Sequence, residues 1–189
     1  IYLNQDKTIA INEEVMNDEV LNDLGVKRED LTATTAAEVG NIFTLRYKFS
    51  EPINLKFDDQ DGIKKTVFMG SYGIGVSRVM GVIAEKFADD KGLVWPENIA
   101  PFKYHLIGIG DQGEEFANNL YKDYSSSILL DDRKLRPGEK FADAELMGIP
   151  YRVVASNKTL ENDSVEITNR QTSETKILSI EEFKQLLRD

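Results

Sequence analysis

The chain has 189 residues, of which 41% are hydrophobic and 30% are charged, a composition that is ordinary for a globular protein. Its 23 basic and 33 acidic side chains give a net charge of −10, which argues against a nucleic-acid interface built on a broad basic surface. The absence of cysteine and the single histidine, His105, exclude disulfides, thiolate zinc sites and sites with several histidines. No apolar run approaches the ~20 residues of a membrane span and no signal-peptide pattern opens the chain, so we expect a cytoplasmic protein without a membrane partner.

The first half of the chain is predicted to combine short helices with strands. Residues 12–24 place apolar side chains at helical intervals, whereas residues 36–56 contain short runs of Ile, Phe, Leu and Tyr that are typical of strands. The turn-forming run 58–62 and the strand 64–69 that follows it predict a hairpin. Residues 76–87 again have helical periodicity.

The second half alternates strands and helices behind an extended connector that contains Trp95, which we expect to anchor it. We place a domain boundary near Ala100, between a segment 1–99 and a domain 100–189. The predicted order is strand, helix, strand, helix, strand, strand, helix, at residues 104–109, 112–124, 127–130, 140–147, 151–155, 164–169 and 180–188. This alternation predicts a small α/β domain with a mixed sheet. His105 lies in an apolar strand and is expected to be a satisfied structural residue.

A glycine-rich run joins a predicted strand to a predicted helix at residues 70–78. It contains Gly70, Gly73, Gly75 and, in the first turn of the helix, Arg78. Glycine lets a ligand approach the backbone closely, and an arginine at this position can place its guanidinium over a phosphate or an adenine ring. Packing alone explains glycine at many such turns, and the spacing is not that of a dinucleotide-binding fingerprint.

The order of residues in this run, Gly-Ser-Tyr-Gly-Ile-Gly-Val-Ser-Arg, resembles motif 3 of the bacterial prolyl-tRNA synthetases, a class II family. Three other stretches agree with that family in the same order, at residues 37–43, 91–102 and 131–146. The resemblance implies an α/β protein with an α+β N-terminal portion. Part of a class II antiparallel sheet would precede an anticodon-binding domain with a mixed five-stranded sheet. It also implies ATP-dependent activation of proline, with Mg2+, and transfer of proline to tRNA(Pro) by an enzyme that is a homodimer when complete.

The resemblance assigns roles to residues around the glycine-rich run. Arg78 would be the catalytic arginine that grips ATP. The residues implied to contact ATP are Glu38, Asn41, Gly73, Gly75 and Arg78, and those implied to line the proline pocket are Phe43, Ser71 and Gly73. From the residues alone, Phe43 is as often an ordinary core aromatic, and Glu38 could be a solvated strand carboxylate.

The charged stretch 131–145 offers groups that suit unpaired bases. Carboxylates accept hydrogen bonds from guanine N1 and N2, cations bind phosphate or guanine O6 and N7, and an aromatic ring stacks on a base. Composition alone favours an ordinary charged strand-to-helix loop. In the synthetases that the chain resembles this stretch faces the anticodon, which ends in two guanines, and the implied contacts are Asp132, Arg133, Lys140 and Glu145.

Two departures from the family pattern bear on activity. Arg46-Tyr47 stands where the family usually has Gly-Thr, beside the implied proline pocket. The chain has no counterpart of motif 1 or of motif 2, so we expect it to be inactive alone. Besides part of a proline–tRNA ligase, it could be a non-catalytic tRNA-binding paralogue or an accessory subunit that pairs with a separate polypeptide.

Overall fold

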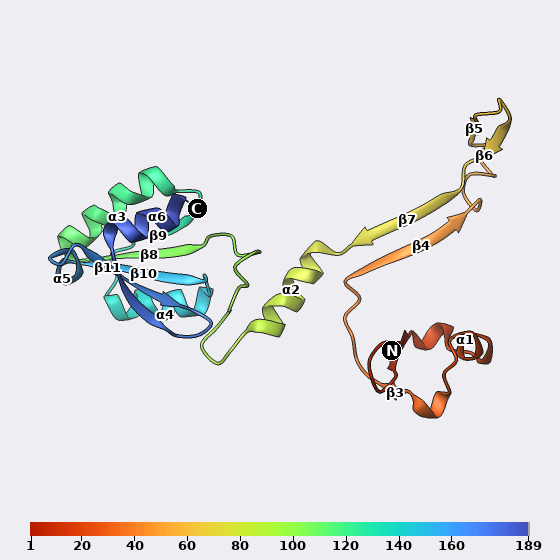
Figure 1. Cartoon of the computed structure of the whole chain (residues 1–189), viewed down its shortest axis with the longest axis horizontal. Helices are drawn as coiled ribbons and strands as arrows, with labels where there is room; N and C mark the ends of the chain where they lie inside the picture. The colour runs from red at the N-terminus through yellow and green to blue at the C-terminus, as the bar shows by residue number, and fades with distance from the viewer. Residues whose placement is uncertain (189) are drawn as a thin grey trace. The chain divides into compact units, whose positions relative to one another are not determined.

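The computed structural model describes residues 1–188 and divides into two compact units, residues 1–79 and residues from 80 onward (Figure 1). The division falls inside helix α2 (Val76–Phe87), so each unit is described by itself. Within residues 1–188 we find no helix that is both long and apolar enough to span a membrane.

The N-terminal residues form a small antiparallel sheet in the order β2-β1-β3, from Ala10–Ile11, Tyr2–Leu3 and Thr32–Ala33. The single helix predicted at residues 12–24 is wrong. A 3-10 turn, η1 (Glu13–Val15), and a separate helix, α1 (Asp18–Asp23), take its place, and a second 3-10 turn, η2 (Arg28–Asp30), follows. Asn12 and Asn17 each cap a backbone N–H, so the helical run starts twice.

Two antiparallel ribbons follow. The predicted hairpin is present as β5 (Lys56–Asp58) and β6 (Lys64–Thr66). Strand β4 (Gly40–Arg46) pairs with β7 (Met69–Ile74), which carries the glycine-rich run and leads into α2. A two-stranded ribbon is marginal in water without a partner layer. One face of the β4–β7 pair exposes large apolar side chains: Ile42 is 75%, Tyr72 79% and Ile74 74% exposed.

The second unit contains the mixed five-stranded sheet, which confirms the expected fold. Its order is β12-β11-β10-β8-β9; β9, β8 and β10 are parallel, and β11 and β12 are antiparallel to their neighbours. The strands are β8 (Tyr104–Ile109), β9 (Ile128–Asp131), β10 (Tyr151–Ser156), β11 (Ser164–Asn169) and β12 (Thr175–Ser179). The helices are α3 (Gly110–Tyr124), α4 (Pro137–Met147), α5 (Asn157–Leu160) and α6 (Ile180–Arg188).

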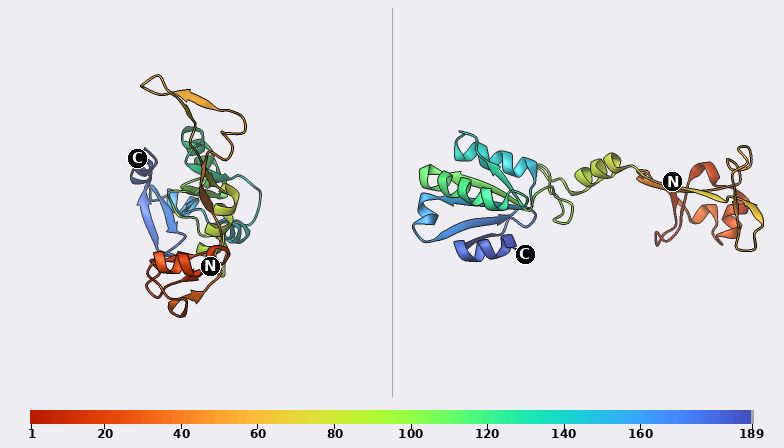
Figure 2. Two further views of the ribbon diagram at one scale, coloured as in Figure 1. Left: turned by 90° about the vertical axis from the view of Figure 1, so that its right-hand side faces the viewer. Right: turned by 90° about the horizontal axis from the view of Figure 1, so that it is seen from above.

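The helices cover both faces of this sheet, with α3 and α6 on one side and α4 on the other (Figures 1 and 2). The main core lies under α3 and α6, where Leu106, Val153 and Phe183 are fully buried. Strand alternation turns the next residues of β8 and β10 to the other face, so the paired residues His105 and Arg152 lie beneath α4. The α4 face therefore has a polar underside, and the charged stretch of the sequence borders it.

Candidate functional sites

Arg133 is held in a fixed position just after strand β9. Its Nε and Nη2 donate to the two carboxylate oxygens of Asp131 at 2.9 and 2.7 Å, and its Nη1 donates to Asp143 of α4 at 2.8 Å. The Asp131 side chain is buried, and the guanidinium of Arg133 lowers its pKa below the ordinary value. The Arg133 side chain stays 45% exposed. The loop thus presents a preorganised planar cation at the surface.

Lys140 supports this loop from below. It is only 3% exposed, and its Nζ donates to the backbone carbonyl of Asp131 at 3.1 Å. Its ammonium is thus directed at the main chain. In this conformation Lys140 positions the loop, whereas the neighbouring Asp132 and Arg133 are open to solvent.

A hollow of about 280 Å³ opens beside these residues. It is lined by His105, Leu129, Leu130, Asp131, Asp132, Arg133 and Met147. Apolar side chains and a histidine ring share this surface with a carboxylate and a guanidinium that are both exposed. Such a combination suits a planar base, which needs apolar contact for its faces and polar groups for its edge.

His105 is neutral in this setting. It is 1% exposed, and burial, partly offset by the attraction of Asp131, lowers its pKa to about 4. Its Nδ1 has no hydrogen-bond partner among residues 1–188, so the expectation that it is structural fits its burial, whereas the expectation that it is satisfied does not.

Glu145 lies farther along α4, beside a second cation. Its carboxylate is 3.8 Å from Nη1 of Arg152 and 3.6 Å from Nζ of Lys91. The Arg152 guanidinium stacks 4.7 Å from the centre of the Phe141 ring, and its Nε is buried without a partner among the described residues. Arg152 is not among the contacts predicted from the sequence. A lone cation within the apolar run of a central strand was the available signal.

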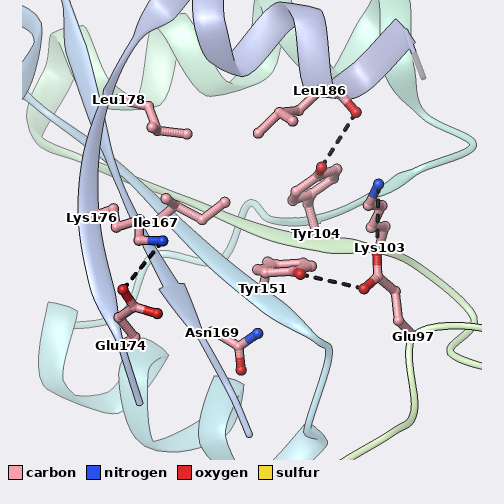
Figure 3. A pocket seen from close by; sticks show the side chains of 10 residues that line it. All are labelled: Glu97, Lys103, Tyr104, Tyr151, Ile167, Asn169, Glu174, Lys176, Leu178 and Leu186. Atoms are coloured by element: carbon pink, nitrogen blue, oxygen red, sulfur yellow. Dashed lines mark hydrogen bonds and ion pairs between the residues drawn. The ribbon is translucent and has the colours of Figure 1, made fainter. Parts of the chain in front are cut away.

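A larger hollow of about 400 Å³ lies on the opposite face of the sheet (Figure 3). Its floor contains the rings of Tyr104 and Tyr151. At its rim Glu97 is 3.5 Å from Lys103, and a 3.2 Å ion pair joins Lys176 to Glu174. Its two rim cations are paired within the protein, as Arg133 is, so ion pairing alone does not separate the two faces. The candidate nucleic-acid interface is placed on the α4 face because the charged stretch 131–145 borders it.

The residues implied to contact ATP and proline come together at β4 and β7. Asn41 lies opposite Gly73, and Phe43 lies opposite Ser71. These facing pairs share one side of the ribbon, because successive side chains along a strand alternate between its two sides. Phe43 is 52% exposed, so it is not a core aromatic in this unit.

Glu38 joins this side of the ribbon to the start of α2. Its carboxylate accepts a hydrogen bond from Nδ2 of Asn41 at 3.1 Å, and its carbonyl accepts one from Nη1 of Arg78 at 2.6 Å. The N–H of Gly75 donates to Val39 at 2.9 Å and closes the turn. Five candidate ATP contacts, Glu38, Asn41, Gly73, Gly75 and Arg78, thus lie along one exposed surface.

Comparison with known proteins assigns the second unit. A family model described as "Anticodon binding domain" matches residues 99–189. Residues 99–189 form an anticodon-binding domain. The five-stranded sheet and its α4 face belong to this anticodon-binding domain, and so do the predicted contacts Asp132, Arg133, Lys140 and Glu145.

Similarity to curated proteins extends beyond the anticodon-binding domain. The chain is 42% identical to the proline–tRNA ligase of Persephonella marina over 168 residues, which cover 86% of this chain and 30% of that protein. It is 47% identical to the enzyme of Levilactobacillus brevis over 151 residues, covering 77% of this chain and 26% of that protein. It is 40% identical to the enzyme of the Wolbachia of Drosophila simulans over 158 residues, covering 83% of this chain and 37% of that protein. The resemblance to the C-terminal, anticodon-binding part of prolyl-tRNA synthetases is therefore confirmed, and the chain spans well under half the length of these relatives.

Proposed function

We propose that the chain is the C-terminal part of a proline–tRNA ligase, in which the anticodon-binding domain recognises the anticodon of tRNA(Pro). The observation that carries this proposal is the fixed Arg133 beside the exposed Asp132, at the rim of a hollow on the α4 face of a domain whose family binds anticodons.

Recognition by this loop would depend on hydrogen bonds more than on net charge. Arg133 is already paired with the carboxylates of Asp131 and Asp143, so the two negative charges exceed its single positive charge. Its exposed edge can still donate to guanine O6 and N7 or to a phosphate, while Asp132 can accept from guanine N1 and N2. Such a site can operate in a protein whose net charge is −10. We infer that Glu145 and Arg152 form a second contact region, with Lys140 in a supporting role.

In the longer protein the first unit would contribute part of the aminoacylation site. Arg78 would bind ATP, which is used with Mg2+ as substrate, and Glu38, Asn41, Gly73 and Gly75 would lie around it. Phe43 and Ser71, facing each other across the ribbon, would line the proline pocket together with Gly73. The complete enzyme is proposed to be a homodimer. The chain alone is not expected to activate proline, because it has no counterpart of motifs 1 and 2.

The proposal is tested by the affinity of the 189-residue chain for a labelled proline anticodon stem-loop. The comparison is with the same RNA in which both anticodon guanines are replaced, at one fixed salt concentration. We expect a preference of about tenfold or more for the guanines, since each well-made base contact is worth about 1–3 kcal/mol. Equal affinity for the two RNAs, or no binding, would contradict anticodon reading by this chain.

Two matched substitutions then locate the contact. We expect Asp132→Asn to remove most of the preference for guanine, because the amide offers a donor where guanine presents donors. Lys134→Met, a charge change in the same exposed loop, is the control and should leave the preference intact. If Asp132→Asn keeps the full preference, the hollow beside Arg133 is not the reading site.

A further inference from the structure

The segment that follows helix α2 is bonded to the end of helix α4. The N–H of Leu93 donates to the carbonyl of Leu146 at 3.0 Å, and the N–H of Trp95 donates to the carbonyl of Gly148 at 3.0 Å. Gly148 ends α4 with φ of 71°, and a Cβ at this position would collide with the carbonyl oxygen of Leu93. Residues 89–95, the docked segment, thus satisfy carbonyls that a helix C-terminus leaves unpaired.

A bidentate ion pair joins the start of the docked segment to the turn that follows strand β11. Nη1 and Nη2 of Arg170, in the turn after β11, each donate to Asp89 at 2.6 Å. The Arg170 side chain is 7% exposed, and its Nε donates to the backbone carbonyl of Glu145 at 3.0 Å. Asp89 also accepts from the N–H groups of Lys91 and Gly92 at 2.9 and 3.1 Å. One buried guanidinium therefore holds both the docked segment and the turn of α4 that carries Glu145.

The side chain of Glu145 meets the same segment. Its carboxylate lies between Lys91 of the docked segment and Arg152 of the sheet, at 3.6 and 3.8 Å. Both distances are long for ion pairs, so this carboxylate can exchange partners at low cost. The carbonyl of Glu145 is fixed by Arg170, whereas its carboxylate is held loosely.

We propose that Arg170 and Asp89 are positioning residues for RNA recognition. They fix the docked segment against Glu145, so RNA that engages the Glu145 carboxylate changes how the docked segment is held. This inference rests on the proposed function and adds to it a link between RNA binding at Glu145 and the docked segment. When the carboxylate turns to a base, Lys91 loses its partner, and the docked segment loses one of its side-chain contacts with α4 while its other bonds remain.

The single tryptophan of the chain, Trp95, lies in the docked segment and reports on it. The experiment titrates the 189-residue chain with the proline anticodon stem-loop and follows two signals. The anisotropy of the labelled RNA measures binding, and the emission of Trp95 measures the state of the segment. We expect the Trp95 emission to shift with the same midpoint as the anisotropy.

Variants separate positioning from folding. Arg170→Lys keeps the charge but loses the bidentate geometry, so we expect a shifted Trp95 emission before RNA is added and an affinity about tenfold lower. Lys91→Met leaves the Asp89–Arg170 pair intact and should keep the RNA affinity within about threefold while it abolishes the RNA-induced shift. Lys122→Met on α3 is the matched control and should behave as the unaltered chain.

The outcomes distinguish this inference from the function on which it rests. If the RNA binds with its guanine preference but Trp95 emission stays constant, the positioning role is wrong and anticodon reading stands. If Lys91→Met keeps the full RNA-induced shift, the link through Glu145 is wrong. If no RNA binds at all, the proposed function fails, and this inference fails with it.

Discussion

Two side chains on the α4 face of the anticodon-binding domain, His105 and Asp131, have pKa values that their surroundings lower. Asp131 stays ionised because Arg133 and the Lys140 ammonium surround it, whereas burial keeps His105 neutral. The neutral ring can lie beside Arg133 and Arg152 without adding a further positive charge to a buried surface. This choice of protonation states makes stability depend on pH.

We predict that stability falls between pH 6.5 and 4. The folded state lowers the His105 pKa from 6.5 to about 4, so protons bind preferentially to the unfolded chain in this window. The stabilisation is complete above the unfolded pKa and is lost as the pH drops through the folded pKa, by about 3 kcal/mol at 1.36 kcal/mol per pKa unit. The charged groups that act on the His105 ring are Asp131, Arg133, Arg152 and Asp143. Urea unfolding from pH 8 to 4 measures the loss, and His105→Leu should flatten it. An equal slope in both proteins would exclude His105 as the source.

Arg46 occupies a backbone conformation that suits glycine. Its φ is 52°, at the irregularity where β4 meets β7, and the family that the chain resembles has glycine there. We predict that Arg46→Gly stabilises the β4–β7 ribbon by about 1 kcal/mol, the approximate cost of a left-handed conformation for a residue with a Cβ. Hydrogen exchange of the Phe43 amide, which the register places in a hydrogen-bonded pair with Ser71, measures this. Lys48→Gly, which has no positive φ to relieve, should instead speed exchange, and the same gain in both variants would contradict the explanation.

At the level of elements, helix α6 illustrates how one side chain secures a peripheral helix. Phe183 is fully buried and packs edge-on against Tyr104, with ring centres 5.3 Å apart. We predict that Phe183→Ala lowers the free energy of unfolding of this unit by about 3–5 kcal/mol, since it removes a core aromatic and leaves a cavity. Leu186→Ala, one turn on and 37% exposed, should cost far less. Equal costs in a denaturant titration would show that α6 is not held by its buried face.

The elements differ in how well the sequence predicts them. Strands β8 and β10 and helix α3 are predictable because each buries a continuous apolar face, so periodicity and environment agree. Strand β12 was missed because it is an edge strand of Thr-Lys-Ile-Leu-Ser, largely exposed, and its identity comes from pairing with β11. The split of the first helix was missed because its cause is local capping by Asn17, which an apolar repeat does not reveal.

The sequence predicts which stretch of the chain forms the candidate site, but it does not predict how the side chains of that stretch are arranged. Residues 131–145 stood out by charge, but no pattern distinguishes the exposed Arg133 from the buried Lys140. That difference arises when α4 folds back onto the end of β9. Arg152, Asp89 and Arg170 come from segments far apart in the sequence, so only the folded chain shows that they share a network through Glu145.

On the scale of the whole molecule, the two units differ in how much apolar surface they bury. The first unit has a three-residue core, Ile11, Met16 and Leu21, and leaves large side chains of its ribbons exposed, whereas the second has an extensive core. A contiguous exposed apolar surface favours association. We propose that further residues of the longer protein cover this ribbon.

We predict that the chain self-associates through the β4–β7 ribbon. Ile42 and Tyr72 face each other on its apolar side and are each more than 70% exposed. Replacing both by Thr should shift sedimentation profiles towards the monomer at high concentration, because less apolar area is removed from water on association. The matched change of Leu135 to Thr, an exposed residue of the second unit, should have no such effect. A monodisperse monomer of the unaltered chain at high concentration would contradict this prediction.

The docked segment also decides where the anticodon-binding domain can be separated from a longer polypeptide. A chain shortened to begin at residue 99, where the family similarity starts, would lack Asp89 and the N–H groups of Leu93 and Trp95. Arg170 would keep its nearly buried guanidinium without a carboxylate, and the end of α4 would lose its hydrogen bonds. A chain that begins at Asp89 would retain them all. The domain that should be expressed, tagged or dissected therefore begins at Asp89, about ten residues before the start of the family similarity at residue 99.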